Sequence, residues 1–152
     1  MKNKIWIDAD ACPVAIKEIL FKAADREKIT TTLIANHAMR LPPSQYLNFI
    51  QVVPGFDVAD NEIIKRMNTN DLIITSDIPL ADAVITKGGL ALSPRGEVFN
   101  TNNIKSKLSM RDFMETIRSS GVQTGGPSAL SQADKQTFAK HLEHWLNQQT
   151  SH

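Results

Sequence analysis

Cysteine is nearly absent from this sequence, since Cys12 is the only one among 152 residues. No disulfide can therefore form within the chain. Proteins that need no disulfide are typical of reducing compartments, so we expect the protein to reside in the cytoplasm. Cys12 itself has no identifiable base nearby in the sequence, which favours a small buried thiol over a nucleophile.

Long apolar runs are also missing near the start of the chain. The first hydrophobic stretch, Ile5 to Ile7, is interrupted by Asp8. Such a stretch is too short for the core of a signal peptide or for a membrane span. We therefore expect no association with a membrane.

Neither sign of charge dominates, and aromatic residues are few. Lys and Arg number 17 against 16 Asp and Glu, a formal net charge of +1, and Phe, Trp and Tyr make up 6% of the chain. A general nucleic-acid binder needs a broad basic surface or a row of aromatic side chains on which bases stack. The composition therefore weighs against tight binding of single strands.

Short β-branched and apolar runs recur along the chain and predict six strands. Leu72 to Ile74 is apolar throughout, as expected for a strand that is buried on both faces of a parallel sheet. The predicted strands are Lys4–Ile7, Thr30–Ala35, Phe49–Val53, Leu72–Thr75, Leu90–Leu92 and the short partner Glu97–Phe99.

Helices are predicted between and after these strands. The first three span Pro13–Arg26, a segment from about Asp57, and Pro79–Lys87. Ser109 with Asp112, and Ser131 with Asp134, have the spacing of capping boxes and predict the starts of two C-terminal helices. Strands that alternate with helices indicate an α/β fold, a three-layer sandwich with a mostly parallel central sheet. We expect a single domain over residues 1–152.

Asp8 and Asp10 stand two residues apart at the end of the first predicted strand. Their side chains should point to the same side, with roughly 7 Å between the Cα atoms. Two such charges repel each other unless a cation lies between them, and a hard divalent cation takes oxygen ligands. Alternatively, one aspartate caps the first helix and the other is solvated.

Two further segments place acids near strand or helix ends. Asp77 directly follows the Leu72–Thr75 strand, and Asp82 lies a little over one turn into the next helix. Asp60 lies in the first turn of the second helix. Each has a structural alternative, because Asp77 is a common N-cap and Asp60 is favourable at a helix N-terminus.

These acids are expected to converge if the first and fourth strands are neighbours. Ligands of open α/β sheets bind beyond the carboxyl ends of the strands, where the winding direction reverses. Carboxylates around one or two ions activate water and stabilise the leaving oxygen in phosphodiester cleavage. We predict a site that binds Mg²⁺ or Mn²⁺ and is also catalytic, made of Asp8, Asp10, Asp60, Asp77 and Asp82.

Two loops are expected near the same edge of the sheet. Arg95, in the turn Ser93–Gly96, is the predicted substrate contact, because a guanidinium group binds phosphate oxygens well. The loop that contains Gly125-Gly126-Pro127 is predicted to cover the site as a lid.

Five segments together resemble the YaiI/YqxD family of bacterial proteins, over nearly the whole chain. They are Ile7-Asp8-Ala9-Asp10-Ala11-Cys12-Pro13-Val14, Ala59-Asp60-Asn61-Glu62, Thr75-Ser76-Asp77-Ile78-Pro79-Leu80-Ala81, Pro94-Arg95-Gly96 and Gly125-Gly126-Pro127. Such proteins are grouped with PIN-like domains, whose members are commonly Mg²⁺- or Mn²⁺-dependent ribonucleases. The resemblance therefore implies a PIN-like fold and a substrate that is RNA or another phosphate ester.

The resemblance also implies roles for the acids. The first PIN acid corresponds to Asp8, with Asp10 as an added neighbour, the helix acid to Asp60, and the acid after the fourth strand to Asp77, with Asp82 as its partner. Asp8, Asp60 and Asp77 would be the primary ligands, while the other two complete a second site or hold water. PIN nucleases usually carry Glu where this chain has Asp60, so this shorter side chain is expected to reach the ion through water.

Two other functions fit the same residues. In a haloacid-dehalogenase-like phosphatase, Asp8 would be the nucleophile that forms an aspartyl phosphate, and Asp10 a general acid. Against this, Asp10 is followed by Ala11-Cys12-Pro13 instead of Gly-Thr, and the chain turns into a helix without room for the usual flap. The third possibility is a non-catalytic PIN-like module that binds RNA or a protein partner.

Overall fold

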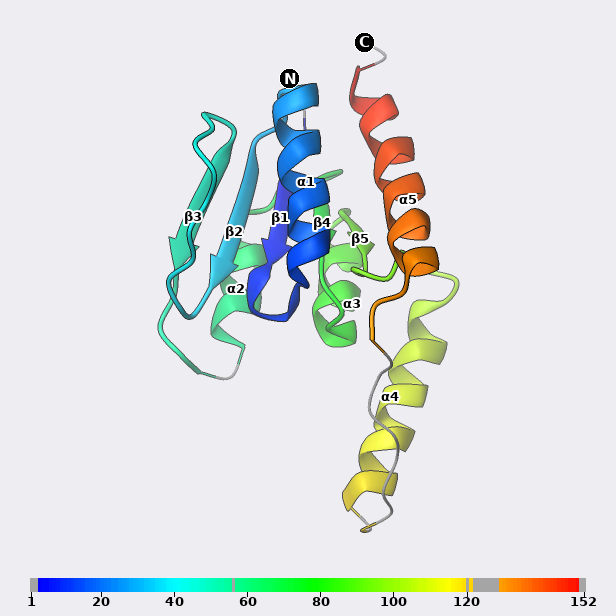
Figure 1. Cartoon of the computed structure of the whole chain (residues 1–152). Coiled ribbons are helices and arrows are strands. Elements are labelled where there is room, and N and C mark those ends of the chain that lie inside the picture. The colour runs from blue at the N-terminus through cyan, green and yellow to red at the C-terminus, as the bar shows by residue number, and fades with distance from the viewer. Residues whose placement is uncertain (1–2, 56, 120, 122–128, 151–152) are drawn as a thin grey trace.

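The computed structural model describes residues 3–55, 57–119, 121 and 129–150. Within these residues, one six-stranded sheet has the order β3-β2-β1-β4-β5-β6 (Figure 1). All neighbouring strands are parallel except β5 and β6, which are antiparallel. The strands are β1 Ile5–Asp8, β2 Thr31–Ala35, β3 Leu47–Gln51, β4 Leu72–Ile74, β5 Leu90–Leu92 and β6 Val98–Phe99.

Helices cover both faces of this sheet, as the three-layer prediction requires (Figure 1). Side chains of α1 and α5 form one hydrophobic core with the sheet. Side chains of α2, α3 and the start of α4 form a second core on the opposite face. The helices are the 3₁₀ helix η1 Ala9–Ala11, α1 Val14–Glu27, α2 Val58–Arg66, α3 Ile78–Thr86, α4 Ile104–Ser119 and α5 Gln132–Thr150. The predicted α/β sandwich with C-terminal helices is confirmed.

The side chains of the central strand β1 enter the two hydrophobic cores in turn, because successive residues of a strand face opposite sides of the sheet. Ile5 and Ile7 belong to the core under α1 and α5. Trp6 belongs to the core under α2 and α3. Both faces of β1 are therefore buried, which fixes its place in the middle of the sheet.

The winding of the chain reverses between β1 and β4. The chain builds β2 and β3 on one side of β1, then crosses back to place β4 on the other side and continues outward. Ile5 is level with Leu72, and Ile7 is level with Ile74. The residues that follow these two strands therefore emerge together, as the sequence predicted for neighbouring strands.

Two predicted boundaries are wrong. The third strand is Leu47–Gln51 and not Phe49–Val53, because its pairing with β2 begins at Leu47 opposite Thr31. The first C-terminal helix begins at Ile104 and not at Ser109.

A reciprocal asparagine cap explains the early start of α4. The Asn100 side chain accepts hydrogen bonds from the backbone N–H groups of Asn102 and Asn103, and the Asn103 side chain accepts one from the backbone N–H of Asn100. Asparagine is among the preferred N-cap residues. The predicted Ser131–Asp134 capping box of α5 is confirmed, with both hydrogen bonds at 3.0 Å.

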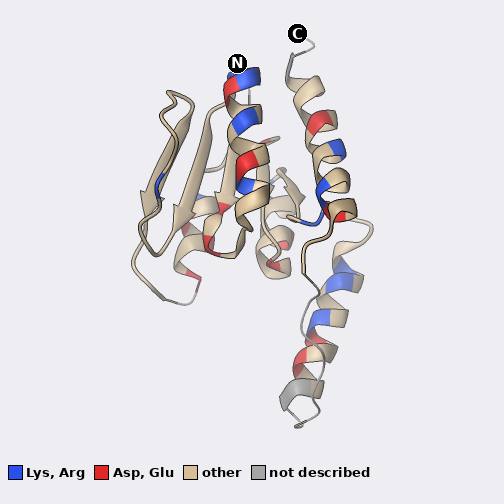
Figure 2. Cartoon of the chain, viewed as in Figure 1, with Lys and Arg blue, Asp and Glu red and all other residues tan. Residues whose placement is uncertain are grey.

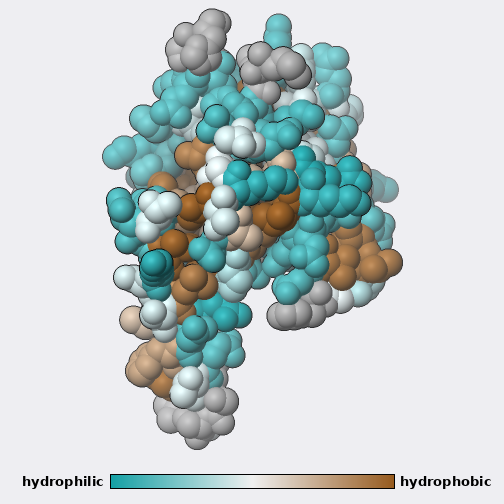
Figure 3. Space-filling model, turned by 180° about the vertical axis from the view of Figure 1, so that it is seen from behind, coloured by the Kyte–Doolittle hydropathy of each residue, from teal (hydrophilic) through white to brown (hydrophobic). Residues whose placement is uncertain are grey.

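Most of α4 projects away from the sheet (Figures 1 and 3). Ile104 is buried in the second core, whereas Met110 and Phe113 are 60% and 58% exposed. In the view from behind, the projecting arm is separated from the body by a notch and carries apolar surface (Figure 3). Within the described part of the chain, no helix combines the length and the apolar character needed to cross a membrane.

Asp71, which the sequence did not single out, ties the amino ends of β1 and β4 together. Its carboxylate is 1% exposed. One oxygen accepts hydrogen bonds from the Lys4 backbone N–H and the Asn3 side chain, and the other from the Trp6 indole and the Asn68 backbone N–H, at 2.8 to 3.3 Å. A buried carboxylate with several donors is stabilising only while they remain together.

We predict that Asp71→Ala lowers the free energy of unfolding by about 3 kcal/mol or more, because buried donors lose their acceptor. Urea denaturation monitored by far-ultraviolet circular dichroism measures the change. Asp112→Ala is the control, since the side chain of Asp112 is 75% exposed. A loss for Asp71→Ala no larger than that of the control contradicts this role.

Candidate functional site

The carboxyl ends of β1 and β4 are joined by a side-chain hydrogen bond. Asp8 is the last residue of β1, and Thr75 directly follows β4. Thr75 is 1% exposed. Its hydroxyl donates to Asp8 Oδ2 at 2.9 Å. The adjacency that the sequence predicted for these two strand ends is therefore observed.

Asp77 is fixed next to this pair by two hydrogen bonds. Its backbone N–H donates to the Thr75 hydroxyl at 3.0 Å. Its carboxylate Oδ1 accepts from the Leu80 backbone N–H at 3.0 Å and caps α3. The structural alternative for Asp77 is therefore realised, and it still leaves the carboxylate beside Asp8.

Asp60 completes a group of three acids that lie within electrostatic reach of one another. Partial burial raises its pKa, with Asp77, Asp8 and Asp57 adding repulsion, to about 7. A hydrogen bond with the Asp77 side chain contributes to the same shift. Near neutral pH, Asp60 is therefore partly protonated. We call Asp8, Asp60 and Asp77 the acid triad.

Asp8 is also affected by this crowding. Burial is the largest cause that raises its pKa, and repulsion from Asp77 and Asp10 adds to it, while the hydrogen bond from Thr75 works in the opposite direction. The triad thus stores repulsion that only a proton or a cation can relieve.

Asp10 has other partners, which sequence reasoning missed. Its Oδ1 lies 2.7 Å from His37 Nδ1, and its Oδ2 accepts from the Asn36 backbone N–H at 2.8 Å. Asn36 and His37 directly follow the buried strand β2. That position at the carboxyl end of a buried strand, where Asp8 ends β1, is the sequence signal that could have identified them.

Asp82 lies in α3, one turn beyond the cap formed by Asp77. Its backbone carbonyl accepts from the Thr86 hydroxyl, and it is not among the groups that dominate the pKa shifts of Asp8 and Asp60. The structure thus brings three of the five predicted acids within electrostatic reach of one another. Asp10 joins them through its effect on Asp8.

Acidic segments gather at the end of the sheet toward which the parallel strands point (Figure 2). They follow β1, open α2 and lie in α3, whereas α1, α4 and α5 carry Lys and Arg as well as Asp and Glu. Among the residues that the structure describes, however, no three His, Cys, Asp or Glu side chains are arranged so that they could hold a metal ion. The side chains of the triad would have to turn to share one ion.

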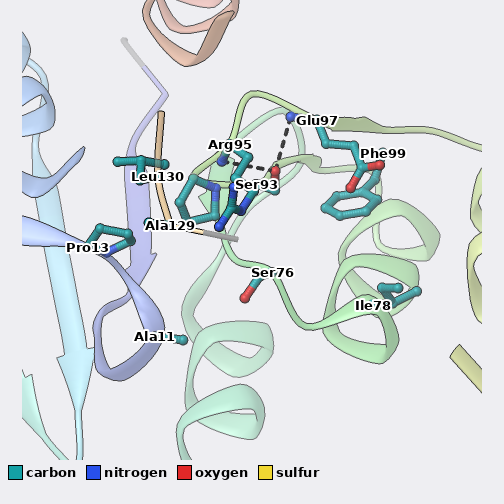
Figure 4. Close-up of a pocket in the computed structure, with 11 residues that line it drawn as sticks. Ala11, Pro13, Ser76, Ile78, Ser93, Arg95, Glu97, Phe99, Ala129 and Leu130 are labelled. Atoms are coloured by element: carbon teal, nitrogen blue, oxygen red, sulfur yellow. Dashed lines mark hydrogen bonds between the residues drawn. The ribbon is translucent and has the colours of Figure 1, made fainter. Parts of the chain in front are cut away.

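Arg95 lines a cavity of about 360 Å³ beside the triad (Figure 4). Its Nη1 donates to Asp134 Oδ2 at 2.8 Å, so the predicted substrate contact already takes part in an ion pair. Hydrogen bonding from Ser131, and to a lesser degree Arg95, holds the pKa of Asp134 below its usual value.

Two further predictions concern Cys12 and the glycine loop. Cys12 is 7% exposed, so the prediction of a buried thiol is confirmed, and burial raises the pKa of this thiol to about 12. The predicted lid at Gly125-Gly126-Pro127 lies outside the described residues.

Residues 6–148 match the model of a protein family described as "Uncharacterized BCR, YaiI/YqxD family". The chain is also similar to several curated bacterial proteins that carry the name UPF0178 protein. One, from Colwellia psychrerythraea, is 66% identical over 145 residues, which cover 95% of this chain and 96% of the relative.

Two other relatives show the same extent of similarity. The protein from Shewanella amazonensis is 61% identical over 143 residues, covering 94% of this chain and 96% of its own length. The protein from Hydrogenovibrio crunogenus is 61% identical over 142 residues, covering 93% and 94%. No solved structure matches the chain.

Crowding of the triad predicts a dependence of stability on pH. Because the folded-state pKa of Asp60 is about 7 and its ordinary value is 3.8, the folded protein binds more protons between these values. The stability contributed by Asp60 should therefore fall as the pH rises from 4 to 7. Without divalent ions, Asp60→Asn should be more stable than the unaltered chain at pH 8 by about 1 to 2 kcal/mol, after allowance for solvent screening.

Urea unfolding in EDTA at pH 5 and pH 8 measures this difference, with Asp112→Asn as the exposed control. The gain of the Asp60→Asn variant should shrink at pH 5. If the gain is equal at both pH values, or absent at pH 8, the triad is not electrostatically strained.

Proposed function

This chain belongs to the YaiI/YqxD family, and we propose that it is a divalent-metal-dependent phosphodiesterase that cleaves nucleic acid, with RNA as the first substrate to test. We place this activity in the cytoplasm, in keeping with a chain whose single cysteine is buried and reduced. The resemblance to PIN-like ribonucleases suggests the reaction. The observation that carries the proposal is the acid triad, whose members come from three separate segments, and in which repulsion from the neighbouring acids adds to burial in raising the pKa values of Asp8 and Asp60.

The position of the triad supports a binding role. It lies beyond the carboxyl ends of β1 and β4, where the winding of the chain reverses. Ligands of open α/β sheets are bound at this point. Helix capping accounts for Asp77 alone. It does not explain why Asp8 and Asp60 are held close to it, at a cost in stability.

The chemistry of these donors fits Mg²⁺ or Mn²⁺, which prefer carboxylate and other oxygen ligands. Asp8, Asp60 and Asp77 would hold the ion, and Asp10 and Asp82 would complete a second site or hold water. A bound ion would supply activation of water and neutralisation of charge on the phosphate oxygens. Because the triad is not arranged for an ion as it stands, its carboxylates must rotate on binding.

The chain's own residues prepare the triad for this role. The Thr75 hydroxyl fixes the orientation of Asp8, and the Asp77 backbone N–H in turn fixes that hydroxyl. Asp60 holds a proton that an incoming cation would displace. Asp77 Oδ1 accepts a hydrogen bond in the cap of α3, and the Asp77 side chain also forms a hydrogen bond with Asp60, which an incoming cation would have to replace.

The phosphatase alternative receives less support. A nucleophilic Asp8 must be ionised, whereas burial raises its pKa by more than the hydrogen bond from Thr75 lowers it. In addition, η1 leads from Asp8 directly to Pro13 and α1, which leaves no insertion between them to act as a flap. These observations favour the nuclease.

Metal binding by the triad has a measurable signature. Isothermal titration of the chain with Mn²⁺ should show saturable uptake that weakens more than about tenfold in Asp8→Asn. Because Asp60 has a pKa of about 7, uptake at pH 6 should release protons. Titrations in two buffers with different ionisation enthalpies detect this release. Unchanged uptake by Asp8→Asn would show that Mn²⁺ binds elsewhere.

Cleavage is tested with end-labelled RNA and DNA in Mn²⁺ and in EDTA. Asp77→Asn should lower metal-dependent cleavage by about a hundredfold or more, while Asn preserves the cap of α3. Asp112→Asn should retain full activity, because Asp112 lies on the projecting helix α4. Saturable Mn²⁺ uptake without any cleavage would instead identify a non-catalytic binding module.

A further inference from the structure

The cavity that contains Arg95 is lined by residues that are close in the chain to the acid triad, although by none of the three acids themselves. One of its lining residues, Ser76, stands between Thr75 and Asp77, and another, Ala11, directly follows Asp10. A ligand in the cavity would therefore extend toward the carboxylates. At about 360 Å³ it is at the small end of ligand pockets, which span roughly 300 to 1,000 Å³.

The walls of the cavity are mainly apolar, and three of the side chains in them, those of Pro13, Pro94 and Phe99, are rings. Pro13, Ile78, Pro94, Phe99 and Leu130 line it, drawn from five different parts of the chain (Figure 4). Phe99 is held in place from outside the cavity, since Lys107 Nζ lies 5.7 Å from the centre of its ring. Such walls suit a planar, weakly polar group.

Polar groups are concentrated in the β5–β6 turn. The Ser93 oxygen accepts hydrogen bonds from the backbone N–H groups of Arg95 and Glu97, at 3.2 and 3.0 Å (Figure 4). These bonds leave the hydroxyl hydrogen of Ser93 to be donated to a ligand atom. Arg95 adds a planar guanidinium that Asp134 holds in place, and guanidinium planes stack on nucleobases.

We propose that this cavity binds one unpaired nucleobase of the strand whose phosphate lies at the acid triad. Apolar walls and a guanidinium plane would stack on the base, and the Ser93 hydroxyl would bond to an acceptor on its edge. A paired base cannot enter such a cavity without leaving its duplex. The preferred substrate is therefore a single strand, recognised through one base and not through a row of stacked bases.

This inference rests on the proposed function, because that function identifies the ligand as a nucleic acid. Binding in the cavity can nevertheless be tested separately from metal binding. Ala129 lines the cavity and is exposed, so a larger side chain there fills the space without disturbing the core. Ala133, exposed in the first turn of α5 and not in the lining, is the matched control. The variants are Ala129→Trp, the smaller Ala129→Leu and Ala133→Trp in the full chain.

Binding of a short fluorescein-labelled oligoribonucleotide is measured by fluorescence anisotropy, with Ca²⁺ in place of Mn²⁺ to limit cleavage. Ala129→Trp should bind about tenfold more weakly or worse, a loss in the range of one stacked base, and Ala129→Leu should be intermediate. Ala133→Trp should bind as the unaltered chain does. A duplex of the same sequence should bind no more tightly than the single strand binds to Ala129→Trp.

Calorimetry with Mn²⁺ on the same variants separates the two proposals. If Ala129→Trp takes up Mn²⁺ normally and binds the oligonucleotide as tightly as Ala133→Trp, the base cavity is wrong and the metal site stands. If filling the cavity weakens oligonucleotide binding while no variant takes up Mn²⁺, the metal site is wrong and the base cavity stands. Equal affinity for single strand and duplex also overturns the base cavity.

Discussion

The parallel pairing of β1 with β4 is the constraint on which the candidate site depends. Its register sets Ile7 level with Ile74, so the next residues, Asp8 and Thr75, meet and form a hydrogen bond. A shift of one residue would turn every side chain of β1 to the other face and expose apolar surface. The cores on both faces of the sheet therefore fix the position of the acids as firmly as they fix the fold.

The two ends of this strand pair hold carboxylates in contrasting surroundings. At the amino end, Asp71 is buried and receives four hydrogen bonds, so its charge is fully solvated by the protein. At the carboxyl end, Asp8 and Asp60 face other acids, and their pKa values are raised. Evolution of a stable fold alone would favour the first arrangement at both ends. Perturbed acids in a group are characteristic of functional sites.

Most of the fold could be predicted from the apolar runs in the sequence, because buried strands consist of such runs. The neighbouring positions of β1 and β4 bring Asp8 and Asp77 together, as the sequence also predicted. What could not be predicted depends on contacts between distant segments. The path of the chain after β2 determines the partners of Asp10. The start of α4 depends on hydrogen bonds between Asn100 and Asn103, and asparagines in a sequence are equally typical of a turn. Asp71 precedes a strand without any local pattern that marks its four donors.

The charges near the triad would affect the two contacts of a nucleic acid differently, namely the contact of its phosphate backbone and the contact of a base. The Arg95 guanidinium is already balanced by Asp134, and the triad repels phosphate unless a cation neutralises it. In the proposed nuclease, attraction for the nucleic-acid backbone would therefore depend on the ion, whereas contact with a base in the cavity would not. A weakly charged chain, with a net charge of +1, can then hold a strand at the site without the basic surface that general nucleic-acid binders use. In the proposed nuclease, affinity from the base would position the strand, and the ion would govern whether the phosphate can approach the carboxylates.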